Sequence, residues 1–388
     1  MSPATEPAAG ARSGLELADI LRLYGPAYVQ AHRLPPGHRK VIRDLQVCRT
    51  AALGGHREHC PRCGFQRLAY NSCRNRHCPK CQAMAKAQWL EARRAELLPV
   101  PYFHLVFTLP HELNPVVLTH PRAMLKALFD AASQTLLTFG RNRFGGQVGF
   151  SLILHTWDQR LNAHFHVHGL IAGGALSFDL QRWMAAKANF LFPVRGLSKV
   201  FRGKFLAAIA PLNLDRSLLA RLRHTPWVVY AKRPFAGPEQ TLDYLGRYTH
   251  RVAIGNHRLV NLIGGKVSFT YRDRARGDVV RAMTLDAHEF IRRFLLHVLP
   301  KGFMRIRHYG FLANRCKGRA LSRCRQLLGQ RVQEPQQRSV EQWILLLTGT
   351  DITRCPRCGA APLIRTELPP AGVWAHSRDP PLALAVAI

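Results

Sequence analysis

Four side chains have the types and spacing of a metal-dependent site that cuts phosphodiesters. His166 and His168 lie in the run LNAHFHVHGLIAGG, and Tyr244 and Tyr248 lie in DYLGRYTH. Histidines two apart project from one face of a β-strand, and tyrosines four apart lie on one face of a helix. A metal on the histidines can polarise a phosphate while a tyrosine oxygen attacks the phosphorus. The pattern predicts covalent cleavage by tyrosine.

A third metal ligand is expected from the strand before the histidine pair. If the two strands form a hairpin that turns over residues 158–163, His155 falls opposite His166, with Cβ atoms about 5 Å apart. A shifted register would offer Gln159 or Asp158 instead. Three protein ligands are typical of a catalytic metal. Mg²⁺ or Mn²⁺ is the expected ion for phosphate chemistry, although imidazoles also accept softer metals.

The tyrosine pair also has a plain structural interpretation, because tyrosines four apart on a helix commonly pack in a core. Its neighbours favour the chemical one. Arg247 and Arg251 lie beside Tyr244 and Tyr248, where cations would favour the phenolate and attract phosphate. We therefore predict that the tyrosines are nucleophiles and that the two arginines bind DNA.

The cysteines between residues 48 and 81 indicate zinc. Two C-x-x-C pairs flank a 14-residue gap and predict one closed structural zinc site, made by Cys60, Cys63, Cys78 and Cys81. A second site is as consistent with the sequence as simple packing and solvated histidines, and it would use Cys48, His56, Cys73 and His77. Arg74 and Arg76 lie inside this segment, and we expect them to contact phosphate.

A third C-x-x-C pair, Cys355 and Cys358, lies near the end of the chain. A lone pair is a weak metal signal, and its partners are expected to be Cys316, Cys324 or a histidine. Ten cysteines grouped this way, in a chain whose first residues have no apolar signal sequence, favour metal binding in a reducing intracellular setting over disulfides.

Charge points to a polyanionic partner. The 388 residues include 56 Lys and Arg against 23 Asp and Glu, a formal net charge of +33. Nucleic acid is the first candidate for such an excess. No apolar run approaches the length of a membrane span, so no membrane partner is expected, and the expected location is the cytoplasm, with the nucleoid.

The order of expected elements indicates an α+β fold. Strands are expected at 102–109, 149–157, 164–173 and 226–233, with helices between them and a further hairpin at 258–273 turning at Gly264-Gly265. Helices are expected at 15–47, broken near Pro26, and at 83–98, 115–139, 180–223, 238–251 and 287–299. Visible hairpins favour an antiparallel sheet covered on one face by helices.

With these residues in view, the chain resembles the two-tyrosine HUH transposases of the insertion-sequence-ninety-one type. The matching segments, in family order, are RTAALGGH (49–56), NSCRNRHCPKC (71–81), VFTLPHELN (106–114), LHTWDQRLNAHFHVHG (154–169), YLGRYTHRVAIGNHRL (244–259) and HYGFLANR (308–315). The family usually has Pro at Phe165 and His at Ala163, and neither departure touches the histidine pair.

The resemblance implies rolling-circle transposition of single-stranded DNA, with His166 and His168 as metal ligands and Tyr244 and Tyr248 as paired nucleophiles. It also implies a ferredoxin-like HUH domain after a zinc-binding DNA-recognition domain. The expected organisation is a disordered start (1–14), a helical and zinc-binding domain (15–100), the HUH domain (101–315), a basic segment with a zinc knuckle (316–368) and a flexible tail (369–388).

The expected partner is single-stranded DNA of the element ends and target. No Walker A helicase motif is present, so unwinding would come from host replication or helicase proteins. Three other functions fit the residues. A replication initiator or relaxase would use the same site on an origin. A zinc-finger DNA-binding protein would use the histidines and tyrosines structurally. A hydrolytic metallonuclease would form no covalent intermediate.

Overall fold

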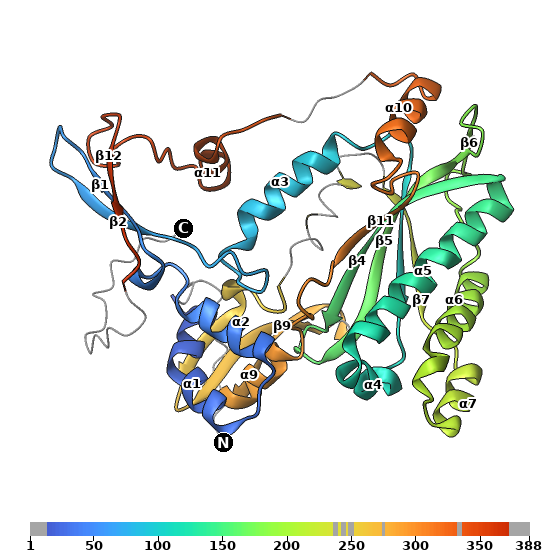
Figure 1. Cartoon of the computed structure of the whole chain (residues 1–388), viewed down its shortest axis with the longest axis horizontal. Coiled ribbons are helices and arrows are strands. Elements are labelled where there is room, and N and C mark those ends of the chain that lie inside the picture. The colour runs from blue at the N-terminus through green and yellow to red at the C-terminus, as the bar shows by residue number, and fades with distance from the viewer. Residues whose placement is uncertain are drawn as a thin grey trace.

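A computed structural model describes residues 14–235, 240–241, 246, 252–273, 276–331 and 336–371. Its largest sheet has the strand order β11-β4-β5-β3-β7, with the short β6 paired to the far end of β5 (Figure 1). The strands are β3 (Tyr102–Thr108), β4 (Gly146–Trp157), β5 (Ala163–Ser177), β6 (Trp183–Ala185), β7 (Val229–Phe235) and β11 (Ile306–Gly310). Every pairing is antiparallel.

This sheet has the ferredoxin-like topology that the resemblance implied. In chain order the units are β3, helices, β4, β5, helices and β7, and the order in space is β7-β3-β5-β4. That is the split β-α-β arrangement, with β11 added beside β4. The helices of the two connections are α4 (Asn114–Thr119), α5 (Pro121–Phe144), α6 (Val194–Ile209) and α7 (Arg216–His224).

The two faces of the sheet bury different side chains, because neighbours along a strand alternate. One face carries Phe107, Leu152 and Val167 into a core with α5 and α6. The opposite face is also packed, by Leu170 and Ile153 against Phe311 and α10 (Lys317–Leu327). The expectation of a sheet covered on one face only is therefore wrong, since the long β4–β5 ribbon also buries apolar side chains on this second face.

A second core joins the start of the chain to a later segment. It contains α1 (Leu17–Ala31), α2 (Pro36–Gln46), α9 (Ala287–Leu295) and the sheet β10-β9-β8. That sheet is built from β8 (Leu259–Ile263), β9 (Lys266–Asp273) and β10 (Val279–Asp286). The β8–β9 turn has Gly264 and Gly265 at positive φ, as predicted. Helix α1 continues through Pro26, where a break was expected, and buried side chains on both sides of it enter this core.

A third sheet, of order β12-β1-β2, lies on the side of the molecule away from the large sheet (Figure 1). It joins β1 (Gly55–His59) and β2 (Gln66–Tyr70) to β12 (Ile364–Leu368), which lies about 300 residues away along the chain. Helix α3 (Gln82–Arg94) leads from this region toward the large sheet, and α11 (Val340–Thr348) lies along the returning chain. In the described part of the chain, no helix has the length and apolar character needed to cross a membrane.

Candidate active site and zinc centres

The three predicted histidines meet on one face of the large sheet. The β4–β5 register sets His155 directly opposite His166, as the hairpin predicted, and His168 is the next same-face residue along β5. Their candidate ligand nitrogens lie within 4.8 Å of one another. The residues are only 3%, 8% and 8% exposed. The shifted register that would have offered Gln159 or Asp158 does not occur.

The nitrogen geometry suits a shared cation. His166 Nε2 and His168 Nε2 are 3.1 Å apart. Metal–nitrogen bonds are about 2.0–2.1 Å, so two nitrogens on one ion lie about 3 Å apart. His166 Nδ1 lies 3.0 Å from the backbone oxygen of His164, a contact in which Nδ1–H donates and the Nε2 lone pair faces the site. Among the described residues no carboxylate joins this group, so the donor set is entirely nitrogen.

His104, on β3, is a site residue that the sequence did not reveal. Its Nε2 lies 2.9 Å from His168 Nδ1, and the two rings are stacked. Burial, helped by the nearby charge of Lys232, lowers the pKa of His104 to about 3, so it is a neutral acceptor for His168 Nδ1–H. A hydrogen bond to the far nitrogen of a metal-binding histidine fixes its tautomer and orientation.

Substitution of His104 tests this orientation. We expect His104→Ala to weaken Mn²⁺ binding by about 10- to 100-fold, the usual effect of losing such a partner. Isothermal titration of the full chain measures it. His164→Ala is the matched control, because His164 lies on the same strand face outside the ligand group and its backbone oxygen is retained. Equal losses in both variants would contradict the assignment.

The tyrosine half of the predicted site lies outside the described residues, together with Arg247 and Arg251. Gly246, between the two tyrosines, is described. A Cβ built on it would lie 3.2 Å from Leu90 Cδ1 and 3.4 Å from Lys86 Cε, so this point of the chain adjoins α3.

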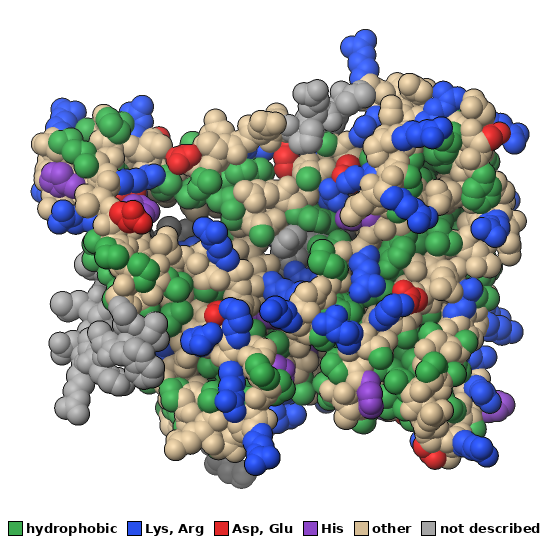
Figure 2. All heavy atoms as spheres, viewed as in Figure 1, with side chains coloured by type: hydrophobic (Ala, Val, Ile, Leu, Met, Phe, Trp, Pro, Cys, Tyr) green, Lys and Arg blue, Asp and Glu red, His purple; other side chains and the backbone are tan. Residues whose placement is uncertain are grey.

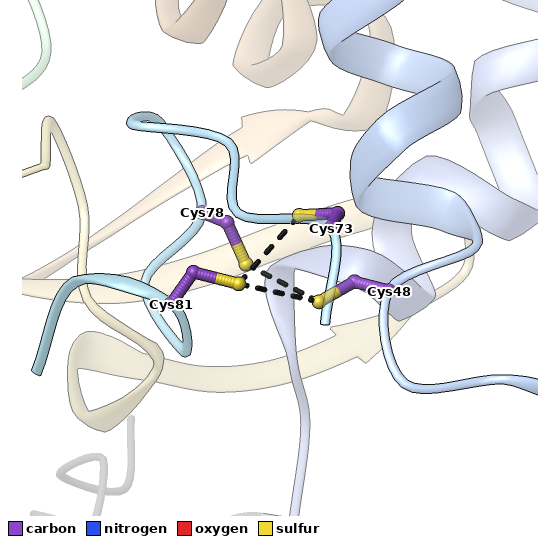
Figure 3. A group of neighbouring side chains, drawn as sticks. All are labelled: Cys48, Cys73, Cys78 and Cys81. Atoms are coloured by element: carbon purple, nitrogen blue, oxygen red, sulfur yellow. Dashed lines mark hydrogen bonds between the residues drawn. The ribbon is translucent and has the colours of Figure 1, made fainter. Parts of the chain in front are cut away.

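The cysteines pair differently from the prediction. Four sulfurs converge between the end of α2 and the start of α3, from Cys48, Cys73, Cys78 and Cys81 (Figure 3). Three of their separations are 3.6, 3.6 and 3.7 Å. Zinc–sulfur bonds of about 2.3 Å in a tetrahedron place sulfurs about 3.8 Å apart, so the cluster fits structural zinc.

Both predicted zinc sets are therefore wrong. Cys60 and Cys63 lie at the tip of the β1–β2 hairpin, whereas Cys78 and Cys81 follow after the chain has returned to its base. A five-residue strand spans about 17 Å, too far for one ion. Neither of the predicted histidine ligands belongs to a cysteine cluster. His56 contacts Glu58. His77 lies beside Arg76, and burial lowers the pKa of His77 to about 3.

The four thiols of this cluster favour a cation for electrostatic reasons. Hydrogen bonding with Cys48 lowers the pKa of Cys81, whereas hydrogen bonding with Cys48 raises the pKa of Cys78. Neighbouring thiols oppose each other's ionisation, and a divalent cation removes that opposition.

Metal removal is expected to unfold the segment around this cluster. Cys48 and Cys78 belong to the core shared by α1, α2 and α9. Because structural zinc contributes on the order of 10 kcal/mol, Cys78→Ser or a chelator should lower the free energy of unfolding by several kcal/mol. Limited proteolysis within residues 48–81 checks this, with Cys316→Ser as control. Unchanged protection after zinc removal would contradict it.

The two arginines predicted to bind DNA here differ in setting. Arg74 is exposed, at positive φ. Arg76 donates to the carbonyl oxygens of Phe303, at 2.6 Å, and Pro300, at 3.1 Å. Its geometry favours a structural role in place of the expected phosphate contact.

Similar proteins place this arrangement in a family. Residues 149–320 match the family described as "Putative transposase", and residues 20–109 match "Transposase zinc-binding domain". The chain is 47% identical over 383 residues to the "Putative transposase y4qJ" of Sinorhizobium fredii (strain NBRC 101917 / NGR234), covering 92% of this chain and 96% of that protein. This chain belongs to the IS91-type transposase family. It is a rolling-circle transposase with an α+β fold and an N-terminal zinc-binding domain.

A second relative is the "Transposase for insertion sequence element IS801" of Pseudomonas savastanoi pv. phaseolicola. It is 31% identical over 355 residues, covering 85% of each protein. Among solved structures, this transposase is similar to the conjugative relaxase TrwC in complex with oriT DNA. That match has 13% identity, covers 59% of this chain and 73% of the relaxase, and has a TM-score of 0.22.

Proposed function

We propose that this transposase acts as an HUH-type nickase and strand transferase on single-stranded DNA. His155, His166 and His168 would hold the catalytic cation, and Tyr244 and Tyr248 would be the nucleophiles. The observation that carries the proposal is the convergence of three buried imidazoles on one sheet face, with the tautomers of His168 and His166 set by His104 and a backbone oxygen. Such a donor set fits a transition metal, and Mn²⁺ better than Mg²⁺.

The described neighbour of the tyrosines supports their assignment. Gly246 adjoins Leu90 of α3. Leu90 packs against the core that contains Ile153 and Leu170. These two residues are the next same-face neighbours of His155 and His168 along β4 and β5. Gly246 is thus linked, through one side chain, to the sheet face that carries the histidines.

In the proposed reaction, one phenol oxygen bonds to the scissile phosphorus and the bond from phosphorus to the 3′-oxygen breaks. The products are a 5′-phosphotyrosine and a free 3′-hydroxyl, which receives the proton lost by the phenol. Bound Mg²⁺ or Mn²⁺ supplies positive charge that polarises the phosphate. Reversal with a new 3′-hydroxyl joins strands without an external energy source, and the second tyrosine allows a second transfer.

The surface suits a nucleic-acid partner. Lys and Arg side chains are spread over the face shown in Figure 2, with few Asp or Glu between them. This matches the net charge of +33. Binding that relies on phosphate contacts should weaken steeply with salt. Family membership favours element ends over a replication origin as the substrate.

The test of this function is a covalent-adduct assay. Labelled single-stranded DNA from an element end is incubated with the full chain and Mn²⁺, and denaturing gels separate protein-bound from free label. We expect label on the protein, and mass mapping of digested adducts to Tyr244 or Tyr248. Cleavage that leaves only free DNA ends would favour a hydrolytic metallonuclease, and DNA binding without cleavage would favour a non-catalytic DNA-binding protein.

A further inference from the structure

The second cysteine cluster joins a segment near the start of the chain to a segment near its end. Cys60 and Cys63, at the tip of the β1–β2 hairpin, meet Cys355 and Cys358 from the segment before β12. Cys60 Sγ is 3.6 Å from Cys358 Sγ, and Cys63 Sγ is 3.6 Å from Cys355 Sγ. These separations match the spacing of about 3.8 Å between thiolates on one tetrahedral zinc. They are far longer than a disulfide bond of about 2.05 Å.

The two halves of this cluster are the same structural unit. The sequence Cys-Pro-Arg-Cys-Gly occurs at 60–64 and again at 355–359. In each copy the glycine amide donates to the carbonyl of the first cysteine, at 3.0 and 2.9 Å. In each copy the first cysteine's amide also donates to the residue after the glycine, at 2.8 Å. Gly64 and Gly359 share a φ of +72°, which favours glycine.

The strands beside the units hold them face to face, because β1, which precedes the first unit, pairs with β2 and β12, which follow the first and second units. β1 lies between β2 and β12, and Glu58 is opposite Arg67 on one side and Arg365 on the other. Glu58 is 2% exposed and accepts from both arginines. Beyond β12, the amide of Ala371 donates to the carbonyl of Ala51 at 2.9 Å.

The module formed by these two units and the sheet β12-β1-β2 has too little apolar core to fold without a further stabilising link. The buried members of its cluster are Cys60, Cys355 and Leu363 alone among the described residues. Modules this small commonly need a metal or a disulfide for stability. The zinc-binding family match ends at residue 109, so it includes Cys60 and Cys63 but not their partners.

We propose that Cys60, Cys63, Cys355 and Cys358 bind a second structural zinc, which closes one zinc ribbon from the two ends of the chain. The site is separate from the histidine site and does not depend on the proposed nickase chemistry. The C-terminal segment is then part of the N-terminal zinc region, and not an independent knuckle or arm. The partners expected from the sequence, Cys316 and Cys324, lie on or beside α10 instead.

Metal counting tests the proposal. The full chain, purified in zinc, is analysed for metal by mass spectrometry. We expect two zinc ions on cysteines in the wild type and one in Cys355→Ser/Cys358→Ser. Cys316→Ser, the matched control, should keep two. A histidine-bound zinc would add equally to all three proteins, so the difference between them decides. An unchanged count in the double variant would overturn the proposal.

Thiol protection distinguishes loss of this zinc from general misfolding. Cysteines are alkylated in the native protein and mapped by mass. In the double variant we expect Cys60 and Cys63 to become reactive while Cys48 and Cys78 stay protected. Protection of Cys60 and Cys63 in that variant would overturn the proposal. A disulfide at these cysteines, detected in the wild type as the loss of its thiol hydrogens from the mass, would also overturn the proposal.

Discussion

His166→Ala/His168→Ala should reduce cleavage of single-stranded element DNA by at least about 10³-fold. A metal at a phosphoryl centre contributes several kcal/mol to the transition state, and each 1.36 kcal/mol is about tenfold in rate. Both imidazoles are buried with their Nε2 atoms 3.1 Å apart, so removing them removes the close ligand pair. Single-turnover cleavage at saturating protein measures the effect.

The matched control is His164→Ala, on the same strand and outside the ligand group. It should cleave within a fewfold of wild type. The double variant should also bind the DNA as before, because the net positive charge remains. Retained cleavage in the double variant would exclude these residues as the catalytic metal ligands, whereas lost DNA binding would indicate that the variant is misfolded.

Tyr244→Phe/Tyr248→Phe should abolish the covalent adduct and lower cleavage by at least about 10⁴-fold, since loss of an enzyme's nucleophile can lower kcat by about 10⁶-fold. Phenylalanine keeps the ring and removes only the attacking oxygen. Each single variant should still form an adduct on the remaining tyrosine, but it should fail to complete the paired transfer of two strands.

The measurement separates these steps with two labelled strands, one scoring adduct formation and the other scoring joining. Tyr230→Phe is a suitable control, since Tyr230 is an exposed residue of β7 outside the tyrosine pair. Full adduct formation by the double variant would show that another residue is the nucleophile, and undiminished cleavage without an adduct would indicate attack by water.

The histidine triad was predictable because its geometry is local. His155 and His166 are joined by one short hairpin, and strand periodicity fixes which side chains share a face. His104 was not predictable in the same way. It reaches His168 because β3 pairs with β5, a contact 64 residues apart that depends on the whole ferredoxin-like sheet.

The cysteine clusters show the same difference between contacts set by nearby residues and contacts set by the whole fold. C-x-x-C spacing identified six of the eight cysteines that form the two clusters, without Cys48 and Cys73, and it did not identify which pairs meet. Cys63 and Cys355 are 292 residues apart, and only the pairing of β12 with β1 brings them together. Nearness in sequence favoured Cys78 and Cys81 as partners of Cys60 and Cys63, and the direction of the β1–β2 hairpin excludes that arrangement.

The central claim is that the histidine triad and the two tyrosines surround one cation. Iron-directed oxidation tests it most directly. Fe²⁺ is bound in place of the native ion, peroxide and ascorbate are added, and oxidised residues are mapped by mass. The account predicts oxidation at the three histidines and on the peptide containing Tyr244 and Tyr248, absent from His166→Ala/His168→Ala. Oxidised histidines with an unmodified tyrosine peptide would contradict it.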